Sequence, residues 1–183
     1  PFGSYANAMQ RFGLAEKMAR MQQQPGFDSN AAVRRTALAA LRAEIEQMPL
    51  DATFTRSLQA RWASQLQTEG VFVRSSSSSE DLPGFSGAGL YTTVPNVKGE
   101  AALQDAVRKV WASVFNFEAW EARRAAGIAQ DAVAMAVLVQ KAVDSEAAGV
   151  RVTRDPLGGT PNSVFSAAKR GIGIRVVEGR RVA

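Results

Sequence analysis

The apolar positions in the first third of the chain recur every third or fourth residue, which predicts three amphipathic helices. The first covers residues 4–24 and ends at Pro25. The second starts at a capping residue among 28–30 and ends at Met48, and the third is capped by Asp51. The apolar stripes of the three helices are Tyr5, Met9 and Phe12, then Leu38, Leu41, Ile45 and Met48, and then Phe54, Leu58, Trp62 and Leu66. We expect these stripes to lie in the core.

Beyond residue 70 the pattern changes from helix to strand. Two helices are predicted at 100–115 and 117–126, where the apolar positions keep a helical period. Strands are predicted from β-branched and alternating runs at 71–73, 90–94, 133–143, 149–153, 164–168 and 174–182. Helices therefore come first and strands mostly later, which indicates an α+β fold rather than a regular alternation of strand and helix.

The stretch that follows the strand at 71–73 is rich in hydroxyl groups and glycine. Arg74 ends the strand, serines occupy 75–79, and Gly84, Gly87 and Gly89 follow an acidic pair. A flexible loop of this kind can wrap a polyphosphate, because glycine lets the backbone approach and N–H, O–H and guanidinium groups donate to phosphate oxygens. The alternative is a linker with a solvated arginine at its start. The spacing matches neither a Walker loop nor the dinucleotide-binding glycine motif.

The acidic pair Glu80 and Asp81 allows two interpretations. Two carboxylates can bind a metal ion, but adjacent residues on a strand or turn tend to point apart. We therefore favour helix capping or a contact with Arg74 for this pair, and we predict no metal ligand in this chain.

Composition excludes several kinds of site. The chain has neither cysteine nor histidine. Disulfides, thiolate or imidazole metal ligands, a Ser-His-Asp triad and a phosphohistidine within the chain are therefore impossible. No apolar run reaches the ~18 residues of a membrane span, and the N-terminus has no charged-then-apolar signal pattern. These features predict a cytoplasmic protein with no membrane contact.

The formal net charge of +5 comes from one end of the chain. Residues 151–183 contain seven Lys and Arg but two Asp and Glu, whereas residues 1–150 contain fifteen of each sign. A basic end can bind nucleic acid or a membrane surface, face the phosphates of an ATP cleft, meet an acidic partner domain or protect edge strands. Few aromatic residues accompany this charge, so we expect strands that face a cleft or a neighbouring domain, and no nucleic-acid surface.

Several short motifs occur in an order that resembles a known family. They are Val73-Arg-Ser-Ser76, Glu80-Asp-Leu-Pro83, Gly87-Ala-Gly89, Val110-Trp-Ala-Ser-Val-Phe115, Met135-Ala-Val-Leu-Val-Gln140, Ala148-Gly-Val150 and Thr153-Arg-Asp-Pro156. Together they resemble the ATP-binding domain of the pyruvate phosphate dikinase and phosphoenolpyruvate synthase family. That family includes rifampin phosphotransferase and the α-glucan water dikinases. The resemblance covers about residues 70–180.

The resemblance implies one part of an ATP-grasp domain. Residues 1–69 would form a helical segment that packs on the nucleotide domain, and residues 70–183 a portion of the ATP-grasp core with a mostly antiparallel sheet. Family members have a lysine-bearing segment upstream of Pro1 and metal ligands in downstream segments, so the chain is expected to be cut at both ends. Ile174 stands where the family often has glutamate, so this chain lacks an acidic residue near the cleft.

Four positions match the nucleotide site of the family by motif. Arg74 resembles the residue that grips the ATP phosphates, which also makes it the candidate catalytic residue. Gly89 and Thr93 resemble residues of the loop over the transferred phosphoryl group, and Gln140 resembles a glutamine that contacts the nucleotide. Considered alone, Thr93 also fits plain β-propensity, and Gln140 fits a polar residue at a strand edge.

The activity implied by the resemblance is phosphoryl transfer from ATP. Phosphate would pass to a phosphohistidine on a separate carrier domain and then to pyruvate or a similar acceptor on another domain, with Mg²⁺ held by ligands outside this chain. The chain alone would be inactive. The alternatives are an α-glucan water dikinase, which Gly87-Ala-Gly-Leu-Tyr91 also resembles, a degenerate nucleotide-sensing module, and a basic nucleic-acid binder.

Overall fold

The structure, a computed structural model, describes residues 2–66, 70–82, 84–153, 164–171, 173 and 176. The chain divides into two compact units, Pro1–Ala142 and Val143–Ala183. Helices come first and antiparallel strands follow, so the predicted α+β class is confirmed.

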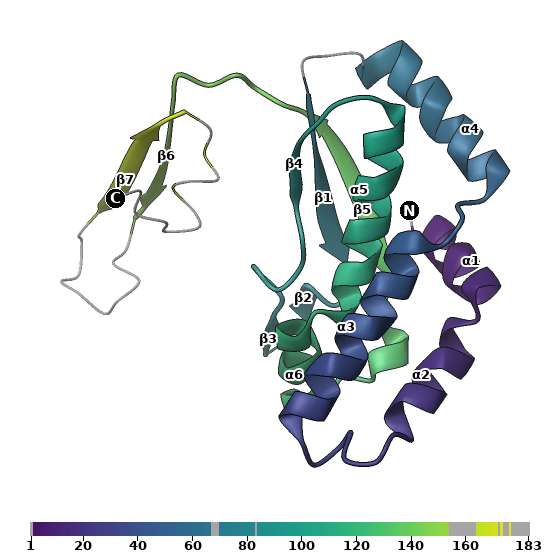
Figure 1. The fold of residues 1–183 in the computed structure, drawn as a ribbon. Coiled ribbons are helices and arrows are strands. Elements are labelled where there is room, and N and C mark those ends of the chain that lie inside the picture. The colour runs from purple at the N-terminus through teal and green to yellow at the C-terminus, as the bar shows by residue number, and fades with distance from the viewer. Residues whose placement is uncertain are drawn as a thin grey trace. The chain divides into compact units, whose positions relative to one another are not determined.

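The N-terminal part of the first unit is helical (Figure 1). Its elements are α1 (Gly3–Phe12), α2 (Leu14–Gln22), α3 (Ala31–Gln47), α4 (Ala52–Arg61) and the short π-helix η1 (Trp62–Leu66). Asn30 caps α3 and Asp51 caps α4 through side-chain hydrogen bonds to first-turn N–H groups, as expected. The single helix predicted over residues 4–24 is wrong, because Gly13 adopts φ = +70° and ends α1. Among the described helices, none is long and apolar enough to cross a membrane.

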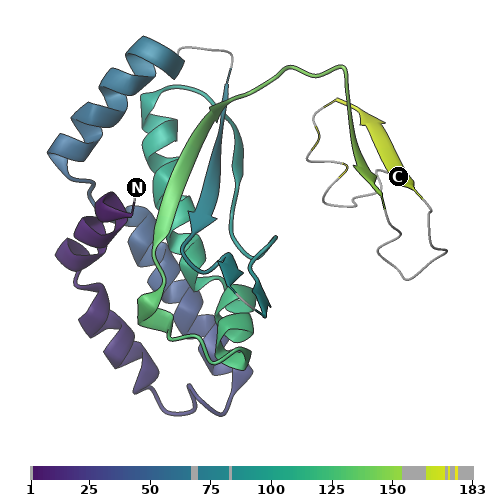
Figure 2. The same ribbon diagram turned by 180° about the vertical axis from the view of Figure 1, so that it is seen from behind.

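A three-stranded antiparallel sheet forms the second layer of this unit, in the order β4-β1-β5. Its strands are β4 (Val94–Val97), β1 (Val71–Ser77) and β5 (Met135–Lys141). Helix α5 (Glu100–Ala112) contacts all three strands, and α3 packs against α5. Helices α3 and α5 lie in front of the sheet in Figure 1, and the sheet lies in front of them in Figure 2. The helices therefore cover one face of the sheet.

The core lies between the sheet and α5 and continues between α5 and α3. The least exposed large apolar side chains, each at 1 % or less, are Leu38, Ile45, Val71, Val73, Leu103, Val107, Val110, Val114, Phe115 and Met135. Each such side chain contributes about 1.5–3 kcal/mol relative to an exposed one. The three stripes predicted for the N-terminal helices are confirmed, since their residues are buried in the core or pack against its edge.

The segments between the main elements are short helices and strands. They are β2 (Asp81–Leu82), β3 (Phe85–Ser86), η2 (Ser113–Phe115), α6 (Phe117–Ala125) and η3 (Gln130–Ala132). The helices predicted at 100–115 and 117–126 are confirmed, the first with a 3₁₀ end. The strand predicted at 90–94 is wrong: the strand is β4, which includes Pro95. As an edge strand with a register shift against β1, β4 tolerates a residue without an N–H group.

The second unit contains one described strand pair, β6 (Ala147–Val152) antiparallel to β7 (Phe165–Arg170). The strands predicted at 149–153 and 164–168 are therefore confirmed with shifted ends. Basic Arg151, Lys169 and Arg170 are exposed on this pair. The strand predicted at 174–182 and the turn predicted at 155–159 fall almost entirely outside the described residues.

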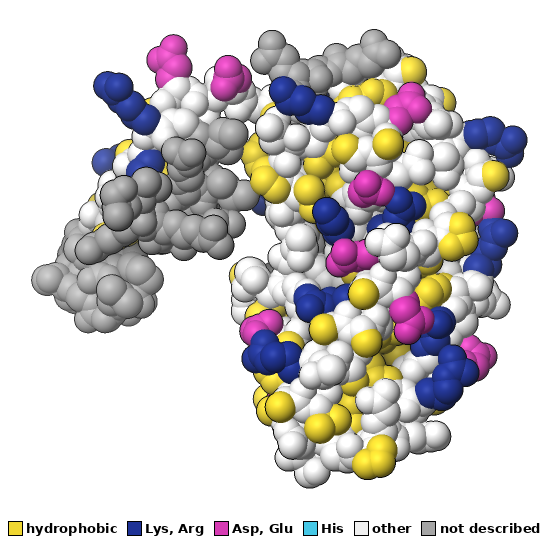
Figure 3. Space-filling model, in the orientation of Figure 1, with side chains coloured by type: hydrophobic (Ala, Val, Ile, Leu, Met, Phe, Trp, Pro, Cys, Tyr) yellow, Lys and Arg dark blue, Asp and Glu magenta, His cyan; other side chains and the backbone are white. Residues whose placement is uncertain are grey.

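Both signs of charge are present on the helical face of the first unit. Figure 3 shows Lys and Arg side chains interspersed with Asp and Glu on this face. The ion pairs Lys17–Glu44 and Arg35–Glu118 join neighbouring helices. The pair Arg108–Asp105 lies within α5. Such mixing is typical of a solvated helical surface.

An ion pair between a buried arginine and a partly exposed glutamate joins α3 to α6. Arg34 is 4 % exposed; its Nε donates to Oε1 of Glu121 at 2.6 Å, and its Nη2 donates to Oε2 at 2.9 Å. Its Nη1 donates to the carbonyl oxygens of Phe27 and Asp28 at 2.6 and 3.1 Å, so the guanidinium also closes the turn before α3. The hydrogen bonds and positive charge of Arg34 hold the pKa of Glu121 below its ordinary value.

Replacing Glu121 with glutamine is expected to lower the free energy of unfolding by about 1.5–3 kcal/mol, because a buried guanidinium loses its charged partner. The matched control is Glu118→Gln, which removes the exposed pair with Arg35. That control is expected to change stability by about 1 kcal/mol or less. Urea unfolding followed by circular dichroism measures both variants. Equal losses in the two variants would contradict the special role of the α3–α6 pair.

The stabilisation from Glu121 should also depend on pH. Because its folded-state pKa is depressed, the stabilisation is present above the ordinary value of 4.5 and is lost as the pH falls through the folded pKa. Arg34, Arg124 and Arg35 face this carboxylate. The stability difference between the wild-type chain and Glu121→Gln should therefore be full near about pH 6 and shrink below about pH 4. A difference that is unchanged at about pH 3 would show that the charge of Glu121 is not what stabilises the fold.

Candidate functional site

One face of the sheet carries Arg74 and is not covered by α5. Side chains alternate along a strand, and Val71 and Val73 are fully buried on the α5 side, so Phe72 and Arg74 point the opposite way. Figure 2 views the sheet from this open side. Leu138, which pairs with Arg74, is 55 % exposed there. We call this surface the open face.

Arg74 and Gln140 lie next to each other on the open face. In the β1–β5 register, Phe72 pairs with Gln140 and Arg74 pairs with Leu138, which places the side chains of Arg74 and Gln140 diagonally on one side. Nη1 of Arg74 donates to Oε1 of Gln140 at 3.4 Å. Both side chains are exposed. Two candidate residues that are distant in the sequence are therefore close in space, and both are accessible to a ligand.

Thr93 lies beside the same part of β1. It directly precedes Val94, which pairs with Val73 in the antiparallel β4–β1 register. Thr93 therefore lies just before the start of β4, at the end of that strand where β1 continues from Val73 to Arg74. Thr93 is half-buried and Arg74 is exposed. Three of the four candidate residues thus lie on the central strand or on the segments next to it: Arg74 is on β1, Gln140 is on β5 and Thr93 precedes β4.

Gly89 is in the turn that precedes Thr93. Its φ is +77°, a backbone conformation that glycine adopts without strain, and a Cβ built there would meet no atom within 4 Å. Within the described part of the chain, no hydrogen bond joins Gly89 to the other three candidates. The structure therefore shows an exposed position close in sequence to Thr93, but no direct contact with Arg74.

The serine run differs from the predicted flexible loop or linker. Ser75, Ser76 and Ser77 extend β1 and pair with residues 137, 136 and 135 of β5. Ser77 and Ser79 are 9 % and 2 % exposed. Backbone pairing with β5 outweighs the weak strand propensity of serine here. The strand predicted at 71–73 is therefore longer than expected, and the segment between β1 and β4 starts at Ser78.

Glu80 has a different role from either of the two that we considered. Its Oε2 accepts a hydrogen bond from the N–H of Ser77 at 3.2 Å, so it closes the serine turn. The expectation of a helix cap or a contact with Arg74 is wrong for this residue. Among the described residues, no group of three or more Asp, Glu, His or Cys side chains could hold a metal ion.

The sequence analysis did not predict a role for Arg123, a buried arginine that contacts the segment between β1 and β4. Arg123 of α6 is 0 % exposed; it donates to Oε1 of Gln130 at 2.8 Å, to the carbonyl oxygen of Val114 at 2.6 Å and to the hydroxyl of Tyr91 at 3.2 Å. Burial lowers the pKa of Arg123, and the interaction with Tyr91 opposes this shift. The available signal was positional, because Arg123 falls on the buried stripe of α6 with Trp120.

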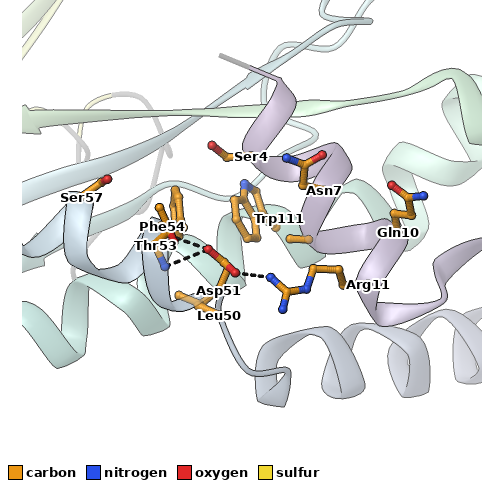
Figure 4. A pocket seen from close by; sticks show the side chains of 11 residues that line it. Ser4, Asn7, Gln10, Arg11, Leu50, Asp51, Thr53, Phe54, Ser57 and Trp111 are labelled. Carbon is orange, nitrogen blue, oxygen red and sulfur yellow. Dashed lines mark hydrogen bonds and ion pairs between the residues drawn. The ribbon is translucent and has the colours of Figure 1, made fainter.

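A cavity of about 580 Å³ lies elsewhere, between α1 and α4 (Figure 4). Trp111 and Phe54 line it together with polar residues of both helices, and Arg11 pairs with Asp51 at its side. None of the four candidate residues lines this cavity. The cavity and the open face of the sheet are therefore separate features of the first unit.

Comparison with known proteins agrees with the nucleotide-binding interpretation. A family model described as pyruvate phosphate dikinase, AMP/ATP-binding domain, matches residues 3–183. Rifampicin phosphotransferase of Streptomyces sviceus is 34 % identical over 145 residues, which are 79 % of this chain and 17 % of that protein. Phosphoenolpyruvate synthase of Neisseria meningitidis is 37 % identical over 153 residues, in a match that covers 78 % of this chain and 19 % of that protein.

A third relative is a probable phosphoenolpyruvate synthase of Staphylothermus marinus, 42 % identical over 110 residues, which are 60 % of this chain and 13 % of that protein. The chain thus spans less than one fifth of the length of these relatives. The family model, by contrast, covers nearly the whole chain. The chain therefore belongs to the family of pyruvate phosphate dikinase AMP/ATP-binding domains.

Proposed function

We propose that the open face of the sheet binds the phosphates of ATP within a larger phosphotransferase of the phosphoenolpyruvate synthase or pyruvate phosphate dikinase type. The observation that carries this proposal is the grouping of Arg74, Gln140 and Thr93 around β1. A guanidinium can donate two parallel hydrogen bonds to a phosphate group. The amide of Gln140 and the hydroxyl of Thr93 add donors on both sides of it.

The same grouping suits the chemistry of phosphoryl transfer. This reaction depends on positioning and charge neutralisation more than on a covalent protein group. Arg74 is at the centre of the sheet, where backbone pairing on both sides fixes the root of its side chain. Gly89 would lie over the transferred group, because its φ of +77° and open surroundings let the backbone approach a phosphate.

The domain organisation in this proposal follows the family. Residues 70–183 form a portion of the ATP-grasp core, and residues 1–69 form a helical layer that supports it. The packing of α3 on α5 is consistent with such support. Mg²⁺ would neutralise charge on the phosphates, and we place its ligands outside this chain, as the resemblance to the family implies.

The phosphate relay would need other domains. This chain has no histidine, so a phosphohistidine would be on a separate carrier domain. The acceptor, pyruvate or a similar molecule, would bind to another domain, as the resemblance to the family implies. A degenerate nucleotide sensor is the second candidate, because Ile174 replaces the glutamate often found in the family. A sensor would bind ATP without transferring phosphate, and an α-glucan water dikinase would transfer it to a glucan.

Replacing Arg74 with alanine should weaken ATP binding by about one to two orders of magnitude, from a lost charged contact of roughly 1.5–3 kcal/mol. Arg74→Lys keeps the positive charge but loses the planar guanidinium that can donate two parallel hydrogen bonds, so an intermediate loss of affinity is expected. Titration calorimetry of the 183-residue chain with ATP and Mg²⁺ measures both. Stability should change little, because Arg74 is exposed.

The matched control is Arg56→Ala, which removes an exposed arginine from α4. It should leave the affinity for ATP unchanged. If Arg74→Ala bound ATP as tightly as the wild-type chain, the open face would not be the phosphate site. If Arg56→Ala lost as much affinity as Arg74→Ala, binding would depend on overall charge rather than on this site.

Incubation of the chain with γ- or β-labelled ATP should leave no acid-labile phosphate on it. The physical reason is the absence of histidine, since a phosphohistidine needs an imidazole nitrogen. The measurement is the amount of label that stays on the gel-purified chain after treatment with acid or with base. Stable label that resists base and is lost in acid would contradict the assignment of the relay to another domain.

A further inference from the structure

The segment between β1 and β4 has both of its ends tied to one buried guanidinium. Nη1 of Arg123 is 3.2 Å from the hydroxyl of Tyr91, near the end of this segment. The Tyr91 hydroxyl is 3.0 Å from Oγ of Ser79, near the start of the segment, and that atom is 3.0 Å from Oγ of Ser77, the last residue of β1. The N–H of Ser79 also donates to Oγ of Ser77 at 3.1 Å. We call these four side chains the hydroxyl chain.

A single donor direction through the hydroxyl chain is available, with Arg123 as the first donor. A guanidinium can only donate, so the Tyr91 oxygen accepts from Arg123 and its proton is available for Ser79. The hydroxyl of Ser79 can then donate to Ser77. Hydrogen bonds that run in one direction polarise and strengthen one another in a buried setting. In this arrangement, the positive charge of Arg123 acts on the whole hydroxyl chain and not on Tyr91 alone.

The segment is also braced between its ends. The N–H of Gly87 donates to the carbonyl oxygen of Glu80 at 2.9 Å, and β2 pairs with β3 between these two residues. A Cβ at Gly87 would lie 3.0 Å from Cα of Glu80 and 3.2 Å from the ring of Tyr91, so the base of the segment is closely packed. Nδ2 of Asn116 donates to the carbonyl oxygen of Leu90 at 3.0 Å. Gly89 lies just beyond this packed base.

We propose that Arg123 is a positioning residue, which sets the place of Gly89 and Thr93 relative to Arg74 by holding the hydroxyl chain. Tyr91 is two residues from both Gly89 and Thr93, so its hydroxyl fixes the part of the backbone that carries them. A buried guanidinium whose described partners are all neutral is costly, which makes a purely space-filling role a poor explanation. The expected effect of Arg123 on ATP binding rests on the function proposed above. Its expected effect on the position of the segment between β1 and β4 does not.

The test compares two tyrosine variants of the 183-residue chain. Tyr91→Phe keeps the ring and removes the hydroxyl from the chain. Tyr5→Phe is the matched control, because Tyr5 is also buried but its hydroxyl has no hydrogen-bond partner in the described part of the chain. Amide hydrogen exchange without ATP should become roughly tenfold faster at Ser79, Gly87 and Leu90 in Tyr91→Phe. The control and the amides of α3 should show no change.

ATP titration then separates positioning from folding. Tyr91→Phe should weaken ATP binding about three- to tenfold, with unchanged affinity in Tyr5→Phe. Ser79→Ala should weaken ATP binding to the same extent. The double variant Tyr91→Phe with Ser79→Ala should lose no more affinity than either single variant, because both substitutions interrupt the same hydroxyl chain. Arg123→Lys, if it folds, should behave like Tyr91→Phe.

Three results would overturn the proposal or one of its parts. Unchanged exchange at the segment in Tyr91→Phe would show that the hydroxyl chain does not hold it. Faster exchange with unchanged ATP affinity would show that the held segment does not position nucleotide contacts. If the wild-type chain bound no ATP, the proposed function would fail, and the exchange data alone would decide whether Arg123 holds the segment.

Discussion

The packing of α5 against one face of the β4-β1-β5 sheet determines where everything else in the first unit can lie. Val71 and Val73 are fully buried against the helical layer, and strand alternation then places Arg74 on the other side. The register with β5 brings Gln140 to the same side. A charged side chain is thereby held on a rigid strand, with its root fixed by the core and its guanidinium exposed. This combination suits a group that must meet a phosphate at a defined place.

Much of the fold follows from local patterns, and the exceptions have identifiable causes. The helical stripes were predictable because burial follows the helical period, as at Leu38 and Ile45. The break at Gly13 was missed because the apolar pattern continues across it. β4 was misplaced because proline is disfavoured inside strands, so the predicted strand ended before Pro95, although an edge strand needs no donor on its outer side. Residues 75–77 were taken for a loop because pairing with β5 is not visible in local propensity.

The candidate site was predictable only in part. Motif order identified Arg74, Gln140, Thr93 and Gly89, but the proximity of the first three depends on strand register, which no short motif contains. The hydroxyl chain was not predictable in the same way, since it joins α6 to two parts of a segment more than thirty residues earlier. Its one local sign was an arginine on a buried helical stripe.

The close packing at Gly87 has a consequence for natural variation in this domain. A Cβ at position 87 would lie 3.2 Å from the ring of Tyr91, and the backbone of Glu80 closes the remaining side at 3.0 Å. A lineage that acquires a larger residue at 87 must therefore shift the ring of Tyr91 or replace it with a smaller side chain, and such a replacement would lose its hydroxyl. Arg123 would then keep a charge with one acceptor fewer. The three positions are thus expected to change together, as a linked set of inherited substitutions rather than one at a time.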